Sequence, residues 1–175
     1  MVSIVVVNYN AGNLLYDTVI SINNSQQYIP YEIIIVDNNS NDNSLNKISE
    51  SNNLILKKLN KNIGFGAACN YGALISNFPF ILFLNPDTKF YKVNLEKIVE
   101  IYNSDKSIGV VGVKNLDENF RVRKSCAYFP KTPHYLNRIF GLSRINGFNF
   151  PGRFMEIDYL KSQFVDQVIG AFFFV

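Results

Sequence analysis

The sequence predicts an α/β fold in which a mostly parallel sheet carries helices on both faces. Short apolar stretches rich in β-branched residues alternate with amphipathic segments along the chain, at the spacing of βαβ units. Right-handed crossovers between parallel strands then place helices on both faces of the sheet. The chain has 175 residues, of which 47% are hydrophobic and 18% charged, so it can bury a sizeable core.

Apolar runs that stop at polar turn residues mark the strands. The expected strands are residues 2–7, 33–36, 54–59, 80–84 and 108–113, and one more within 164–175. Residues 114–120, KNLDENF, are expected to turn between two extended pieces. The apolar run AFFFV at 171–175 is expected to lack a strand partner and to leave apolar surface exposed, which suggests a truncated chain.

Helical periodicity marks the segments between the strands. One helix carries Leu15, Val19 and Ile22 on one face, and a short helix is expected around Leu45 and Ile48. A glycine-containing loop runs into a helix of small residues after residue 63, and a later amphipathic helix follows residue 94.

Short polar residues follow three of the expected strands, at 8–10, 37–40 and 85–88. In any one loop, such residues are simply good turn formers and helix caps. The carboxyl ends of parallel strands meet at one edge of an α/β sheet, where ligands bind. The three loops together therefore predict a binding site at that edge.

The chemistry that these loops favour is diphosphate binding. Asp87, stiffened by Pro86, is a hard oxygen ligand for Mg²⁺ or Mn²⁺, and substrate phosphates can complete the coordination of such ions. Gly64 and Gly66 allow close backbone approach at a helix N-terminus. Gly64 and Gly66, followed by Asp87, also permit the glycine fingerprint of a dinucleotide-binding oxidoreductase. Two observations oppose this interpretation: Cys69 occupies the third glycine position of that fingerprint, and the loop is not in the first βα turn, where the fingerprint belongs.

The distribution of charge and the length of the apolar runs limit which classes of partner the chain can have. From residue 119 to 155 there is no Asp or Glu, and the stretch holds Arg121, Arg123, Lys124, Lys131, Arg138, Arg144 and Arg153. Aromatic side chains lie between these cations, so the segment is either an ordinary solvated flank or a contact with an anionic membrane surface or a lipid diphosphate. No motif supports nucleic-acid binding. No apolar run reaches the roughly 20 residues of a membrane span, and no signal peptide is recognisable, so a cytoplasmic location is expected.

Four motifs in order resemble the family 2 glycosyltransferases, which have the GT-A fold. They are VSIVVVNYNAGNLL, IIIVDNNSNDNS, NIGFGAACNYG and ILFLNPDT, and the Asn-Pro-Asp-Thr variant is most similar to the rhamnosyltransferase-like branch. The resemblance covers about residues 2–113, with VDQVIGA near the end.

The resemblance implies a donor nucleotide site at the ends of the first two strands. Val7 and Tyr9 match the segment that holds the nucleotide base, with the Tyr9 ring stacking on it. Asp37 and Asn38 match the carboxylate motif that contacts base and ribose, although many family members carry Asp at the position of Asn38. The identity of the base is therefore left open.

The resemblance also implies a diphosphate and metal site. The loop and helix with Gly64, Gly66 and Asn70 match the part that flanks the diphosphate sugar. Asn85 and Asp87 match the Asp-x-Asp metal motif, with Asn85 in place of the first Asp and Asp87 as the ligand of Mg²⁺ or Mn²⁺.

The activity implied is inverting transfer of a sugar from a nucleoside-diphosphate sugar to a glycan or lipid-diphosphate acceptor, in cell-surface polysaccharide synthesis. Residues 1–114 would bind the donor, and 115–175 would begin the acceptor side, at the inner face of the membrane through 119–155. The family's catalytic base follows the GA strand, so it is expected beyond Val175. A non-catalytic sugar-nucleotide-binding module is the alternative.

Overall fold

The fold is known from a computed structural model, which describes residues 1–132, 135, 139, 154–155 and 157–175. The chain divides into two compact units, Met1–Val111 with Gly170–Val175, and Gly112–Ile169. The first unit holds one five-stranded sheet with the order β3-β2-β1-β4-β9. Its strands are β1 (Val2–Asn8), β2 (Tyr31–Asp37), β3 (Leu54–Lys58), β4 (Phe80–Leu84) and β9 (Phe172–Phe174).

The sheet is parallel except at one edge. β1 lies between β2 and β4 and runs parallel to both, and β3 runs parallel to β2. β9 pairs antiparallel with β4. This mainly parallel α/β sheet confirms the predicted fold class.

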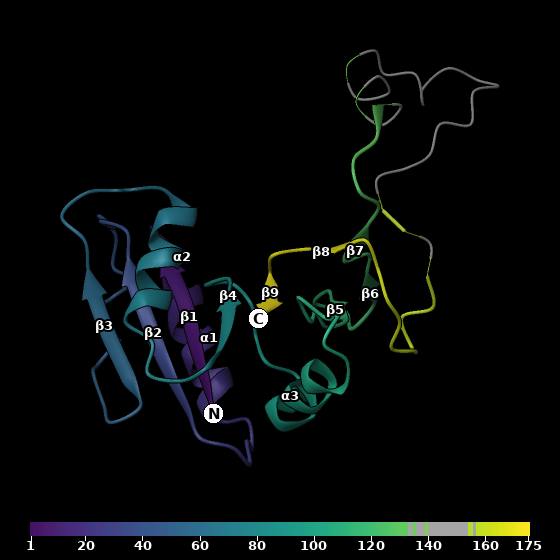
Figure 1. Cartoon of the computed structure of the whole chain (residues 1–175). Coiled ribbons are helices and arrows are strands. Elements are labelled where there is room, and N and C mark those ends of the chain that lie inside the picture. Colours follow the sequence, from purple (N-terminus) through teal and green to yellow (C-terminus); the bar gives the residue numbers. More distant parts are fainter. Residues whose placement is uncertain (133–134, 136–138, 140–153, 156) are drawn as a thin grey trace. The chain divides into compact units, whose positions relative to one another are not determined.

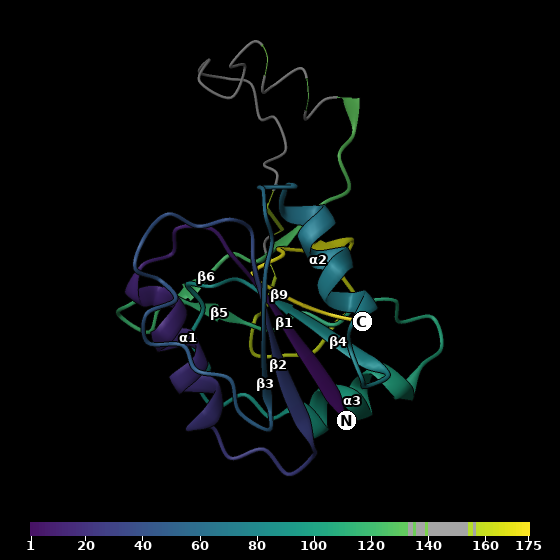
Figure 2. The same cartoon turned by 90° about the vertical axis from the view of Figure 1, so that its left-hand side faces the viewer.

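Helices cover both faces of the sheet. Figure 2 shows α1 (Asn13–Asn23) and α2 (Phe65–Leu74) on opposite sides of the strands. α1 buries Leu15, Val19 and Ile22, as its periodicity predicts. α3 (Leu95–Ser104) follows β4, and the Asn94 side chain caps it by accepting a hydrogen bond from Lys97 N.

α2 approaches the sheet closely because of one glycine. Its Ala68 and Cys69 pack in a cluster with side chains of β1 and β2, among them Val5 and Val36. A Cβ added at Gly72 would overlap the Val5 side chain. Helix and sheet therefore pack at a distance that only glycine allows at this position.

Two expected elements are not regular in the structure. Residues 45–48 form turns rather than a helix, and Asp42 begins this region by accepting hydrogen bonds from the amide and hydroxyl of Ser44. Such local side-chain bonds compete with helix formation. Residues 108–113 join the sheet only through a bridge from Val111 to Phe174, because β9 occupies the edge of β4.

The C-terminal apolar run is paired, which corrects the expectation that it would be exposed. The prediction of a single strand in 164–175 is also wrong, because the segment forms β8 (Gln167–Val168) in the second unit and β9 in the first. Phe172 and Phe174 are buried, and Phe174 stacks on Phe80 with 5.6 Å between ring centroids.

The described residues of the second unit include two short strand pairs. β5 (Asn115–Leu116) and β6 (Val122–Arg123) form the hairpin predicted for KNLDENF, and β7 (Cys126–Ala127) pairs with β8. These strands are labelled in Figure 1. Most of the basic and aromatic segment, including His134, Arg138, Arg144 and Arg153, lies outside the described residues. No helix among the described residues is long and apolar enough to cross a bilayer.

Candidate functional site

The site lies at the topological switch point of the sheet, where the order in which strands are added reverses from one side of β1 to the other. From β1 the chain adds β2 and β3 on one side, and it then crosses to add β4 on the other side. β1 and β4 thus flank the switch point, where α/β folds bind ligands beyond the carboxyl ends of the strands. Asn8 is opposite Asp37 and Val6 is opposite Leu84, so the loops at 8–10, 37–40 and 85–88 begin side by side.

A buried amide and carboxylate join the ends of β1 and β2. Asn8 Nδ2 donates to Asp37 Oδ1 at 2.7 Å, to Ser44 Oγ at 2.8 Å and to Ser40 Oγ at 2.9 Å. Asp37 Oδ2 also accepts from Ser40 N at 3.2 Å, and Asp37 is only 3% exposed. Asn8 Oδ1 is buried and accepts no hydrogen bond from the described residues. The loop after β2 is thereby fixed to β1.

Asn38 connects the same edge to the glycine loop. Its Nδ2 donates to Asn62 Oδ1 at 2.9 Å, and its Oδ1 accepts from Ile63 N at 2.9 Å. Asn62 Oδ1 in turn accepts from Gly64 N at 2.9 Å. The buried Asn38 side chain, through one donated and one accepted hydrogen bond, therefore positions the start of α2. Gly64 enters this helix with φ 86°, a conformation that favours glycine.

Asp42 ties the β1 loop to the β2 loop. Its Oδ2 accepts from Gly12 N at 2.8 Å, while Ser44 donates to Oδ1 from both its hydroxyl and its amide. The hydrogen bond from the Ser44 hydroxyl, followed by those from the amides of Ser44 and Gly12, holds the pKa of Asp42 below its ordinary value. Gly12 and Asn10 both have positive φ in this turn.

The turn after β4 is held from two sides. Thr18 of α1 donates to Pro86 O at 2.8 Å, and Asn85 N donates to Ala171 O at 3.2 Å. The turn closes on itself through a bond from Thr88 N to Asn85 O at 3.2 Å. Asp87 is exposed at the tip, so its carboxylate faces solvent from a supported turn.

The remaining predicted residues divide into exposed and buried groups. The Tyr9 side chain is 52% exposed, and Gly64, Gly66 and Asn70 are exposed as well. Val7 packs in the core with the side chains that α2 covers. Tyr9 and Asp87 are thus exposed at this edge, whereas Asp37 and Asn38 are buried and hydrogen-bonded to the neighbouring loops.

The donor set at this edge fits a metal that is shared with a ligand. No group of three or more His, Cys, Asp or Glu side chains gathers in the part of the chain that the structure describes. Asp87 and the neighbouring amide Asn85 would therefore supply few ligands themselves. Mg²⁺ and Mn²⁺ tolerate such sites, because waters and substrate phosphates complete their coordination.

Two residues of this site were missed from the sequence, namely Asp42 and Asn62. Both lie in Asn-rich loops where each residue is an ordinary turn former. Their partners, Gly12 and Asn38, are 30 and 24 positions away, so no local pattern could pair them.

The chain is similar to known glycosyltransferases. The sequence model of the family described as Glycosyl transferase family 2 matches residues 3–164. The poly(ribitol-phosphate) beta-N-acetylglucosaminyltransferase TarP of Staphylococcus aureus is 34% identical over 121 residues, which cover 65% of this chain and 37% of that protein. A glycosyltransferase of Nostoc sp. is 29% identical over 114 residues, which cover 63% of this chain and 35% of that protein.

Solved structures share the fold. The crystal structure of S. aureus TarS 1-349 matches with a TM-score of 0.57 at 24% identity, covering 76% of this chain and 41% of that one. TarS 1-349 in complex with UDP-GlcNAc matches with a TM-score of 0.58 at 24% identity, covering 71% of this chain and 37% of that one. The GT-A fold expected from the motifs is confirmed, while the rhamnosyltransferase-like branch stays a prediction. This chain spans little more than a third of the two curated relatives, and it belongs to glycosyl transferase family 2.

Proposed function

We propose that this chain carries the donor side of an inverting glycosyltransferase, which moves a sugar from a nucleoside-diphosphate sugar to a glycan or lipid-linked acceptor. The observation that carries the proposal is the pair Tyr9 and Asp87. They follow β1 and β4, on either side of the switch point, and both side chains are exposed there. An aromatic ring and a carboxylate at this edge suit the base and the metal-bound diphosphate of one ligand.

In this proposal the buried network holds the shape of the nucleotide site. Tyr9 stacks on the base, and Asp37 contacts base or ribose. A carboxylate has about four acceptor sites, and Asn8 and Ser40 N occupy two of those on Asp37. The remaining capacity can accept a ligand hydroxyl or N–H without breaking the scaffold.

The diphosphate would lie between Asp87 and the start of α2. Gly64, Gly66 and Asn70 are exposed along this path, and Gly66 has open space around its Cα. Asp87 would hold Mg²⁺ or Mn²⁺ together with the diphosphate, and Asn85 would hydrogen-bond ribose or phosphate. When bound, the ion neutralises negative charge on the departing nucleoside diphosphate.

The proposal also covers the acceptor and the location of the protein in the cell. TarP is named for poly(ribitol phosphate), so a polymer acceptor in cell-surface polysaccharide synthesis is the first candidate for this chain. Residues 1–114 would form the donor half and 115–175 the acceptor side. We place the protein in the cytoplasm, with 119–155 contacting the inner membrane face. Asp166 is not assigned as base, because its Oδ2 accepts from Phe129 N at 3.0 Å, a bond that fits a structural role.

Calorimetry with UDP tests the metal contact. Asp87→Ala should abolish the Mn²⁺-dependent part of UDP binding and leave unfolding unchanged, because the side chain is exposed. Equal Mn²⁺-dependent affinity in this variant would remove Asp87 from the site. Tyr9→Ala should weaken binding by on the order of 1–3 kcal/mol, whereas Tyr9→Phe should retain it because stacking needs only the ring.

Gly66→Ala separates ligand contact from folding. An added Cβ at Gly66 meets no atom within 4 Å, and Ala favours a helix over Gly by about 1 kcal/mol. The variant should therefore be at least as stable as the parent yet bind UDP more weakly. Unchanged affinity would show that the diphosphate does not approach this backbone.

A further inference from the structure

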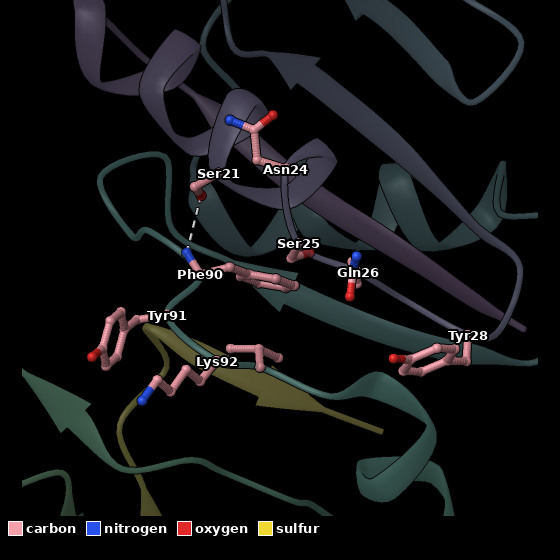
Figure 3. A pocket seen from close by; sticks show the side chains of 9 residues that line it. Ser21, Asn24, Ser25, Gln26, Tyr28, Phe90, Tyr91 and Lys92 are labelled. Carbon is pink, nitrogen blue, oxygen red and sulfur yellow. Dashed lines mark hydrogen bonds between the residues drawn. The ribbon is translucent and has the colours of Figure 1, made fainter.

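A cavity of about 400 Å³ lies in the first unit, and none of the residues assigned to the donor site lines it. One wall is the end of α1 with the residues that follow it, 21–28, and the other is the segment 90–93 before α3. Figure 3 shows Phe90 between Tyr28 and Tyr91 along this cavity. Its volume lies within the range of about 300–1,000 Å³ that small-molecule sites occupy.

Hydrogen bonds between the two walls hold the cavity open. Ser21 Oγ accepts from Phe90 N at 3.0 Å, which is the dashed line in Figure 3. Gln27 Nε2 donates to Val93 O at 2.8 Å, and Gln27 Oε1 accepts from Leu95 N at 2.9 Å. Phe90 is buried and packs against Phe172, so the floor is part of the core. The cavity is therefore formed before any ligand arrives.

The lining combines aromatic rings with hydrogen-bonding groups. Tyr28 is 74% exposed and Tyr91 is 53% exposed. Asn24 and Gln26 add amide groups from the α1 side. Lys92 lies with its Nζ 5.4 Å from the centre of the Tyr91 ring and has φ 53°, an unusual conformation for a residue other than glycine. Such conformations persist where the surroundings impose them, and they cluster at ligand sites.

The cavity shares no lining residue with the candidate donor site. α1 begins after Gly12, which bonds to Asp42 at the donor edge, and it ends beside the cavity. Its 11 residues span about 16 Å at the rise of 1.5 Å per residue. The Asp87 turn lies between these two ends, because Thr18 in the middle of α1 donates to Pro86 O.

We propose that the cavity is a second carbohydrate-binding site, which holds one sugar ring of a glycan chain. The apolar face of a sugar ring suits the exposed Tyr rings, and its hydroxyls suit the amides and the carbonyl end of α1. A phosphate group would call for a cluster of cations, whereas Lys92 is the cation that lines the described cavity. A purely apolar ligand would make no use of the amides of Asn24 and Gln26, which line the cavity. The site goes beyond the proposed function and does not require the donor site to work.

Saturation-transfer NMR on the full chain tests the site with named sugars. The probes are N-acetylglucosamine, glucose and the chitin trimer of N-acetylglucosamine, each with and without saturating UDP and Mn²⁺. We expect transfer to the ring C–H protons in both conditions, because the residues that line the cavity are not those assigned to UDP. The trimer should bind more tightly than the monomer if the natural ligand is a chain, and equally if it is a free sugar.

Variants assign the signal to the cavity. Tyr28→Ala should reduce affinity about tenfold, and Tyr28→Phe should retain it, since the ring alone stacks. Leu74→Ala is the matched control, because it removes an exposed apolar side chain elsewhere in the first unit and should leave sugar binding unchanged. Circular dichroism checks that the Tyr28 variant is folded.

Three outcomes would overturn the proposal. Loss of the signal on adding UDP and Mn²⁺ would place the sugar in the donor site. Equal binding by Tyr28→Ala and the parent would place it elsewhere on the chain. No transfer to any of the three sugars would show that the cavity does not bind these carbohydrates, while UDP calorimetry on the same sample would report separately on the donor site.

Discussion

Glu32 supports a buried network at the end of the sheet opposite the donor site, and replacing it should destabilise the fold. It lies on β2 opposite Ser3 of β1, and Ser3 Oγ donates to Glu32 Oε1 at 2.6 Å. Asn77 donates to Oε1 from its backbone N and to Oε2 from Nδ2, both at 2.7 Å. The carboxylate thus fixes the loop between α2 and β4 to the sheet.

The expected cost follows from which donors lose their partner. In Glu32→Ala, the exposed Asn77 side chain can turn to water, while the Ser3 hydroxyl and the Asn77 backbone N–H stay without an acceptor. Each unsatisfied buried group costs about 1–3 kcal/mol, so the loss of both acceptors should lower the unfolding free energy by about 2–6 kcal/mol. Glu32→Gln keeps an acceptor for Ser3 and Asn77 N and should lose about 1 kcal/mol.

The same network makes stability depend on pH. Burial acts to raise the pKa of Glu32, but hydrogen bonds from Ser3 and from the backbone and side chain of Asn77 hold it below its ordinary value of 4.5. A carboxyl whose pKa falls on folding stabilises the fold above its unfolded pKa. That contribution is lost as the pH drops through the folded pKa. The stability gap between the parent and Glu32→Gln should therefore narrow on acidification.

Urea unfolding followed by far-UV circular dichroism measures both effects, at about pH 7 and at descending pH. Glu118→Ala is the control, because Glu118 is exposed and its removal should change stability by less than about 0.5 kcal/mol. A loss in Glu32→Ala no larger than in this control would refute the reasoning. A gap between parent and Glu32→Gln that stays constant as the pH falls would refute the pKa argument alone.

Three further substitutions test the packing and the strand-end network by the same unfolding assay. Gly72→Ala should cost about 1–3 kcal/mol, because its Cβ overlaps Val5, whereas Gly66→Ala on the same helix should cost nothing; equal effects would contradict the close approach of α2. Phe174→Ala should cost about 3–5 kcal/mol, since this fully buried ring stacks on Phe80, and a loss below about 1 kcal/mol would mean that β9 is not part of the core. Asn8→Ala should lose about 1–3 kcal/mol and also weaken UDP binding by loosening Asp37; a stable variant with parental affinity would exclude the network from the site.

Local patterns were sufficient where each residue's role depended on its neighbours in sequence. The apolar runs of β1, β2 and β4 and the periodicity of α1 predicted those elements, because a buried parallel strand and an amphipathic helix have distinct patterns. The polar ends of the same strands predicted that the loops at 8–10, 37–40 and 85–88 lie at one edge, since the carboxyl ends of parallel strands face the same edge of a sheet. A pattern of turn residues likewise predicted the β5–β6 hairpin.

The sequence was insufficient where segments far apart in the chain compete for the same sheet edge. Residues 108–113 have the composition of a strand, but β9 occupies the edge of β4 and leaves them one bridge. AFFFV was expected to be exposed, yet pairing with β4 buries Phe174 completely. Which partner takes a sheet edge depends on the packing of segments about 90 residues apart, and no local pattern encodes that.

The candidate site divides in the same way. By itself the sequence determined that Tyr9 and Asp87 belong to one edge of the sheet, because the βαβ pattern makes the strands parallel and their carboxyl ends lie at the same edge. Only the tertiary structure decided the strand order, the burial of Asp37 and Asn38, the loop contacts of Asp42 and Asn62, and the cavity at the end of α1. A side chain's role depends on the distant groups that reach it, and folding alone brings those groups together.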